Sequence, residues 1–390
     1  DFELAVNGAA FEFLHQLMKQ GEGEPLHLVM ERAKVFARMS PEQKQTLVEL
    51  FAEEHGRIVG MCGDGANDCG ALKAAHVGLS LSDAEASIAA PFTSSIQNIT
   101  PLLQLMREGR GALVTSISCF KFMALYSAIQ FITVLRLYRI NTNMSDFQYL
   151  WIDLFLIFPL AVYMARTGPY HTLSVERPHG RLISFPVLAS VGGQTVIAAS
   201  FQFFAAWWTY QISSFRCDDA HCPPGGGFCD PSSDDPLPPC CAAEPLGADC
   251  ASRPIMSDTD DNIMSVEATS AFLFSQFQYL AVVIAFNTSK PFRRNLVTNR
   301  WFFGSFLLLS LSSSLLLLLP DDVIALLDEK ITTLEMQRFP TAAFKLRLFC
   351  LAFVNSVVTY AFECIVEAIA RRHEQRSLPL PAAVSIVFVV

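Results

Sequence analysis

The chain has 390 residues, of which 52% are hydrophobic and 17% are charged, and its formal net charge is −9. This composition argues against a purely soluble enzyme and favours burial in a membrane. The acidic balance and the lack of a Lys/Arg-rich run exclude nucleic-acid binding. Charged residues are frequent in residues 1–110 and sparse in later stretches, so we expect a soluble head followed by a membrane tail.

The start of the chain reads as the interior of a domain. Residues 1–8 have the pattern of a strand entering a turn, without the basic start and apolar stretch of a secretory signal. Position 1 is Asp1 and not an initiator Met. We therefore expect this chain to be the C-terminal fragment of a longer protein.

The first well-marked helix of the head begins after the short apolar run 35–38. Ser40 is predicted to cap it, with Pro41 at the first helical position and Gln43 completing a capping box. Lys44 lies in its first turn, close to the loop end of the preceding strand, and is predicted to point into a strand–helix crevice. The alternative is a solvated helix lysine, which is the common case for an isolated lysine.

The next unit is a predicted parallel strand at 57–62, followed by an acidic glycine turn and a helix at 69–75. Gly63 and Gly65 allow a tight phosphate-binding turn, and Asp64 and Asp68 place two carboxylates at the end of the strand. Carboxylate oxygens suit Mg²⁺, which neutralises a transferring phosphoryl group. The alternative is that both aspartates are only turn and helix-cap residues.

Two segments of the head resemble the phosphorylation-domain signatures of P-type ATPases: Phe36–Lys44 (FARMSPEQK) and Met61–Ala75 (MCGDGANDCGALKAA). Cys69 and the stretch Leu79–Ser94 resemble subgroup B of the fifth group, whose members export polyamines from late endosomes and lysosomes. The similarity continues into the membrane region, through Gln148 and Thr167–Pro169, and covers most of the chain. It implies an α/β, haloacid-dehalogenase-like (Rossmannoid) partial phosphorylation domain, followed by an all-α transmembrane bundle in a late endosomal or lysosomal membrane.

The resemblance also implies roles for individual residues, with ATP as substrate and Mg²⁺ as cofactor. Lys44 would steady the aspartyl-phosphate oxygens, Asp64 would bind Mg²⁺, and Asp68 and Asn67 would support that site, with Asp68 as a second metal ligand. Asn7 occupies the segment in which the family has a Thr or Ser that hydrogen-bonds the phosphoryl group. Its amide can still donate such a bond.

Several components of a complete pump do not occur in the sequence. It contains no Asp-Lys-Thr-Gly-Thr nucleophile motif, ATP-binding domain or actuator domain, so we expect the isolated chain to be inactive. The leading interpretation is a portion of a polyamine-exporting pump. The alternatives are a pump for an inorganic cation, and a truncated, non-catalytic membrane regulator. A soluble phosphatase of the same superfamily would not need six membrane spans.

Apolar windows of about twenty residues predict six membrane helices. Lys and Arg gather before the first helix and after the second, fourth and sixth, which marks that side as cytosolic. We divide the chain into a partial phosphorylation domain (residues 1–105), a transmembrane domain (residues 106–372) and an unassigned tail (residues 373–390). The helices are expected near 114–138, 147–165, 184–212, 267–288, 301–319 and 343–369.

The loop 213–265 is expected on the lumenal side. It carries ten acidic residues against two arginines, which favours either an acidic vestibule for cations or a solvated loop with no transport role. It also holds six of the chain's 11 cysteines, which predicts disulfides on an oxidising side. Six cysteines allow fifteen pairings, and the sequence does not choose among them.

Polar residues inside the predicted membrane helices outline a cation path. Asp153 lies in an apolar run, with Asp146 seven residues earlier on the same helical face. Tyr126 and Gln130 form an i, i+4 pair on the preceding helix, so we expect the two helices to offer carboxylates, an amide and aromatic faces to an organic cation. The alternative is ordinary hydrogen bonding between helices.

Three further polar residues in these helices have structural interpretations. Lys121 is interpreted as snorkelling to the interface, and Gln194 and Gln202 as pairing with neighbouring helices.

Overall fold

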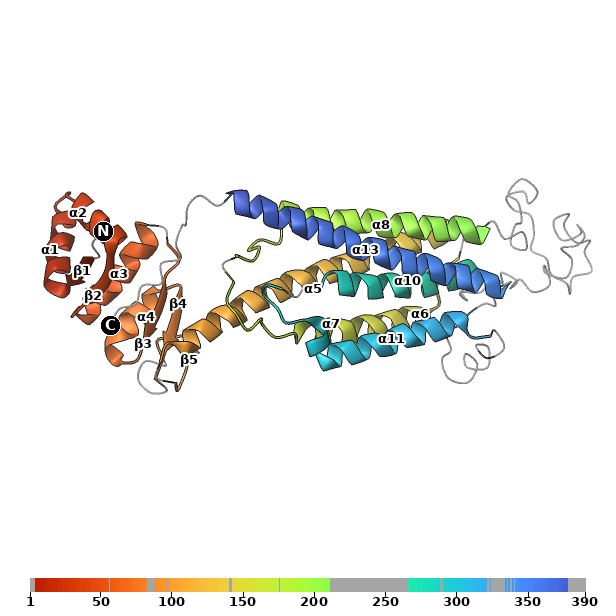
Figure 1. The fold of residues 1–390 in the computed structure, drawn as a ribbon, viewed down its shortest axis with the longest axis horizontal. Helices are drawn as coiled ribbons and strands as arrows, with labels where there is room; N and C mark the ends of the chain where they lie inside the picture. The colour runs from red at the N-terminus through yellow and green to blue at the C-terminus, as the bar shows by residue number, and fades with distance from the viewer. Residues whose placement is uncertain are drawn as a thin grey trace, which may run out of the picture. The chain divides into compact units, whose positions relative to one another are not determined.

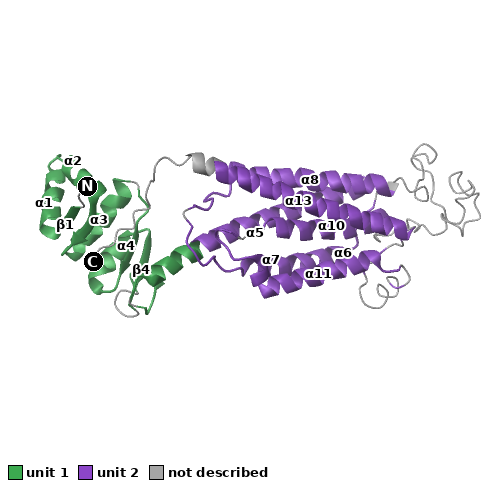
Figure 2. Cartoon of the chain, viewed as in Figure 1, with its two compact units in different colours: residues 1–109, 377–390 green, residues 110–376 purple. Residues whose placement is uncertain are grey.

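The computed structural model describes residues 4–55, 57–82, 88–96, 98–139, 142–174, 176–210, 266–287, 290–320, 323, 334, 336, 339 and 341–377. The chain forms two compact units, residues 1–109 with 377–390 and residues 110–376 (Figure 2). The expectations for loop 213–265, its charge and its disulfides, and for the end of the tail lie outside the described residues.

The first unit is built from short parallel strands and helices (Figure 1). Its strands form two parallel sheets, β1-β2 and β3-β4-β5. Their bounds are β1 Leu4–Asn7, β2 Ala33–Ala37, β3 Gly60–Gly63, β4 Val77–Ser80 and β5 Phe92–Thr93. The helices are α1 Gly8–Lys19, α2 Glu24–Arg32, α3 Pro41–Glu53 and α4 Cys69–Ala74, with a 3₁₀ turn at Ala66–Asp68.

The capping box predicted at the start of α3 is present. The Ser40 hydroxyl accepts from the Gln43 main-chain N–H at 3.2 Å, and the Gln43 side chain accepts from the Ser40 N–H at 3.0 Å. Two N–H groups that a helix end leaves unpaired are thereby satisfied. The apolar face of α3, with Leu47 and Phe51, is buried in the core of the unit. These contacts fix where α3 begins, and therefore where Lys44 lies.

Among the described residues, six helices are long and apolar enough to cross a membrane, so the expected number is confirmed. Five of them are unbroken: α5 Thr100–Tyr138, α8 Phe185–Tyr210, α10 Val266–Ala285, α11 Arg300–Leu318 and α13 Ala342–Ser377. The first, α5 Thr100–Tyr138, begins well before the apolar window near 114. The first turns of α5, before residue 114, contain several polar and charged residues, so a search for apolar windows does not detect them.

The second span is not one regular helix. It consists of α6 Asp146–Leu150, a π-helical segment Trp151–Ile157 (η2) and α7 Phe158–Ala165. Within it the Phe158 N–H donates to the Asp153 carbonyl, five residues back. Such π-turns are rare and frequently lie at functional sites. The expected regular helix at 147–165 is therefore interrupted at Asp153.

Helix α10 is the central helix of the second unit. In its most apolar window 89% of the residues are buried, against 28% in α5, α8, α11 and α13. The predicted pairing of Gln202 is present, because its amide donates to Thr133 of α5 at 2.7 Å and to Gln278 of α10 at 2.9 Å. Large apolar side chains such as Phe131 and Phe353 lie exposed on the outside of the bundle. An apolar exterior around a polar-paired interior is what a bilayer requires.

Candidate functional site

Lys44 and Asp68 form an ion pair in the first unit. The Lys44 ammonium donates to Asp68 Oδ1 at 2.9 Å, and both side chains are largely buried. Lys44 comes from the first turn of α3 after β2, and Asp68 from the turn after β3. The carboxyl ends of β2 and β3, which belong to the two separate parallel sheets of this unit, thus place a cation and a carboxylate together. The carboxyl ends of parallel strands are where open α/β sheets bind ligands.

The acidic turn after β3 exposes one carboxylate and buries the other. Asp64 and Asn67 are exposed, whereas Asp68 is 6% exposed. A Cβ at position 63 would lie 2.5 Å from Asp68 Oδ2, so Gly63 is required by this close approach. Gly65 has extended backbone angles and no atom closer than 4.0 Å to such a Cβ, so packing does not demand glycine there.

Asn7 serves a structural function in the described contacts. It caps α1, and its Oδ1 accepts from the Ala10 N–H at 2.9 Å. The Gln43 amide donates to the Gly8 carbonyl at 3.2 Å, which ties the end of β1 to the start of α3. Since the cap uses the amide oxygen, the amide nitrogen of Asn7 is the group that can donate to a ligand.

The acidic turn also acts on a neighbouring thiol. Burial raises the pKa of the Cys62 thiol, and the charges of Asp64 and Asp68 raise it further. A raised pKa lowers the thiolate fraction at a given pH, and the thiolate is the reactive form. Asp64→Asn removes one of these charges, so we expect faster alkylation of Cys62 by iodoacetamide at pH 8, measured by mass spectrometry of its peptide.

The control for this alkylation experiment is Glu42→Gln. Glu42 is an exposed carboxylate in the first turn of α3 and is not among the charges acting on Cys62. This variant should leave the rate unchanged. Equal rates for the wild type and Asp64→Asn would show that Asp64 does not act on the thiol.

The carboxylates of the acidic turn, Asp64 and Asp68, can contribute to a Mg²⁺ site. No group of three or more His, Cys, Asp or Glu side chains able to hold a metal occurs within the described ranges. Mg²⁺ is commonly bound by one or two carboxylates, with waters and substrate phosphate completing its shell. Exposed Asp64, next to an Asp68 held by Lys44, fits that arrangement.

In the second unit, Asp153 contacts the preceding span. Tyr126 of α5 donates its hydroxyl to Asp153 Oδ1. The Tyr126 ring packs edge-on against Tyr279 of α10, with 5.5 Å between ring centroids. Tyr279 is 1% exposed and was not singled out by sequence reasoning, because one aromatic residue in an apolar helix carries no distinctive pattern.

Two other predicted path residues lie close to this contact along the chain. Gln130 lies one turn beyond Tyr126 on α5 and is half-buried. Asp146 is the exposed first residue of α6, which begins with a Ser145 cap. The π-helical segment Trp151–Ile157 begins two residues before Asp153, so the regular helix on which the expected common face depended does not run unbroken from Asp146 to Asp153.

The snorkelling interpretation of Lys121 is wrong. Lys121 is 9% exposed and forms an ion pair with Glu363 of α13. The pairing predicted for Gln194 is present, because its amide donates to the Thr359 carbonyl at 2.9 Å and to Glu363 at 3.4 Å. Sequence reasoning missed Glu363, which follows apolar residues near the end of the last span.

Known proteins that the chain resembles are named as cation- or polyamine-transporting ATPases. The chain is 39% identical to human "Polyamine-transporting ATPase 13A3" over 313 residues, covering 79% of this chain and 24% of the relative. It is 44% identical to human "Polyamine-transporting ATPase 13A2" over 283 residues, covering 72% of this chain and 21% of the relative. The chain is 37% identical to yeast "Vacuolar cation-transporting ATPase YPK9" over 315 residues, covering 81% of this chain and 19% of the relative. No protein-family model matches the chain.

The chain is thus a relative of the P-type cation-transporting ATPases, and the six membrane-length helices among its described residues make it a multi-pass membrane protein. Within that class it is similar to polyamine-transporting ATPases, so the resemblance to subgroup B of the fifth group is confirmed. It spans about a quarter of the length of curated relatives such as human 13A3, of which it covers 24%.

Proposed function

We propose that this chain belongs to an ATP-driven pump that exports polyamines from the lumen of late endosomes or lysosomes to the cytosol. One observation carries the proposal: a buried Lys44–Asp68 pair lies beside an exposed Asp64 at the carboxyl ends of parallel strands, in a chain whose described part includes six membrane-length helices. The names of the relatives support both the ATPase activity and the polyamine substrate.

In this proposal residues 1–105 belong to a haloacid-dehalogenase-like phosphorylation domain, and its residues act on the phosphoryl group of an aspartyl phosphate. Asp64 holds Mg²⁺, which supplies charge neutralisation when bound. Lys44 stabilises phosphoryl oxygens, and Asp68 orients Lys44 through their 2.9 Å contact while completing the metal site. Asn67 supports this turn, and the amide nitrogen of Asn7 donates to the phosphoryl group.

Residues 106–372 form the transmembrane domain in this proposal. Asp153 offers a carboxylate from the π-helical turn, and Tyr126 offers a hydroxyl and a ring face. Gln130 and Asp146 extend the path along α5 and towards the start of α6. A polyamine carries several ammonium groups on an apolar chain, so alternating carboxylates and aromatic surfaces suit it.

The test is ATP hydrolysis by the full-length protein reconstituted in lipid vesicles. We expect spermine and spermidine to stimulate Mg²⁺-dependent hydrolysis several-fold and saturably. Chlorides of mono- and divalent metal ions serve as the comparison at matched ionic strength. Stimulation by a metal ion without stimulation by polyamines would instead support the inorganic-cation alternative.

A further inference from the structure

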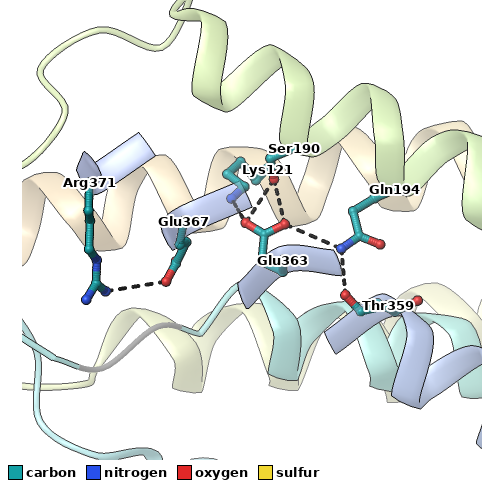
Figure 3. A network of polar contacts seen from close by, with 7 residues as sticks. All are labelled: Lys121, Ser190, Gln194, Thr359, Glu363, Glu367 and Arg371. Atoms are coloured by element: carbon teal, nitrogen blue, oxygen red, sulfur yellow. Dashed lines mark hydrogen bonds and ion pairs between the residues drawn. The ribbon is translucent and has the colours of Figure 1, made fainter. Parts of the chain in front are cut away.

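A second polar centre lies within the membrane unit, away from the contacts of Asp153. Glu363 of α13 accepts from Lys121 of α5 and from the Ser190 hydroxyl of α8, which lies 2.9 and 2.8 Å from its two oxygens (Figure 3). The Gln194 amide, one turn further along α8, donates to the same carboxylate at 3.4 Å. Three helices therefore meet at one carboxylate.

This centre is almost entirely sealed from solvent. Glu363, Ser190 and Gln194 are each 1% exposed, and Lys121 is 9% exposed. A charge inside a membrane is tolerated only when it is paired and hydrogen-bonded. The Glu363 carboxylate meets this condition, since hydroxyl, amide and ammonium donors all contact it.

An aromatic ring completes the environment of the ammonium group. The Lys121 Nζ lies 4.4 Å from the centroid of the Phe286 ring, directly after α10, which is a cation–π contact. The ammonium group itself contacts the Glu363 carboxylate and the Phe286 ring face, while the Ser190 hydroxyl and the Gln194 amide hold that carboxylate in place. A fixed carboxylate beside a ring face is what recognition of a free primary amine requires. We call this group of four residues the ammonium cage: Ser190, Gln194, Phe286 and Glu363.

We propose that the ammonium cage is a binding site for a primary alkylammonium ion, and that the side chain of Lys121 is its tethered occupant. The occupied cage positions α5 against α8 and α13. The proposal follows from the described contacts alone and does not require that the protein transports polyamines.

The cage is distinct from the contact of Tyr126 with Asp153. Lys121 and Tyr126 are five residues apart on α5, which separates them by about 7.5 Å along the helix and by about 140° around it. Two carboxylates from different helices therefore hold α5 on well-separated faces, Asp153 through a hydroxyl and Glu363 through an ammonium.

The experiment removes the tether and supplies a free amine. Lys121→Ala is made in the full-length protein, and its melting temperature in detergent is measured with increasing propylammonium chloride. A ligand that binds only the folded state raises the melting temperature, so we expect a rise that grows with the propylammonium concentration once this exceeds Kd. The wild type, whose cage is filled, should not respond, and propanol and tetramethylammonium should have no effect.

The double variant Lys121→Ala/Glu363→Gln is the decisive control, because it lacks the carboxylate. It should not respond to propylammonium. An equal response of both variants, or no response of Lys121→Ala, would overturn the proposal. If Lys121→Ala yields no folded protein, its yield is compared after expression with and without propylammonium: recovery supports the cage, and an unchanged yield contradicts it. Neither readout depends on transport, so failure of the polyamine proposal would be seen separately.

Discussion

Asp64→Asn lowers ATP hydrolysis by the full-length protein by at least about 10³-fold. The substitution keeps the size of the side chain and removes the exposed carboxylate at the end of β3, which in the proposed site holds Mg²⁺. The buried Lys44–Asp68 pair stays intact, so the fold of the unit should survive. The measurements are steady-state hydrolysis over a range of Mg²⁺ concentrations and the yield of acid-stable phosphoenzyme.

The matched control for this activity measurement is again Glu42→Gln. It removes one exposed carboxylate from the same unit, at the start of α3, and should leave hydrolysis within about twofold of the wild type. Melting temperatures of both variants establish that they are folded. Wild-type turnover in a folded Asp64→Asn protein would remove Asp64 from the metal site.

The features of the fold that local chemistry decides could be predicted from the sequence. The start of α3 follows from Ser40, Pro41 and Gln43, whose cap bonds lie within three residues of one another. The positions of Lys44 and Asp68 after predicted strands placed each of them at a strand–helix turn, although their contact with each other was not predicted. Six apolar windows predicted the number of membrane-length helices, since bilayer thickness sets their length.

Features that depend on packing between distant segments could not be predicted. Lys121 and Glu363 are 242 positions apart, and each taken alone reads as a charge near the end of a span. Only the packing of α5 against α13 shows that they are partners. The π-helical turn at Asp153 could not be predicted either, because a hydropathy pattern does not distinguish i→i+4 from i→i+5 hydrogen bonds.

For the glycines of the acidic turn, too, the sequence does not show which contacts the folded chain makes. Both Gly63 and Gly65 suggested a tight turn, yet a close approach requires only Gly63, where Asp68 packs against the backbone. A sequence shows that the backbone is permitted to turn, but not which neighbour uses the vacant Cβ position.

Asp153→Asn raises the polyamine concentration for half-maximal stimulation of ATP hydrolysis by about 10- to 100-fold. This fold-change corresponds to the free energy of one charge-assisted hydrogen bond. The amide can still accept from Tyr126, so the packing of α5 against the π-helical turn should be retained. What is lost is the negative charge that an ammonium group needs inside the membrane. The measurement is spermine-stimulated hydrolysis by the reconstituted full-length protein.

Two comparison variants separate charge from packing at this position. Tyr126→Phe removes the hydroxyl that donates to Asp153 but keeps the carboxylate and the ring packed against Tyr279, so its effect should be smaller. Asp146→Asn removes a carboxylate at the first residue of α6, outside the apolar run that holds Asp153, and should also have the smaller effect. If Asp153→Asn responds to spermine as the wild type does, the path runs elsewhere, and the contact between Tyr126 and Asp153 only joins two helices.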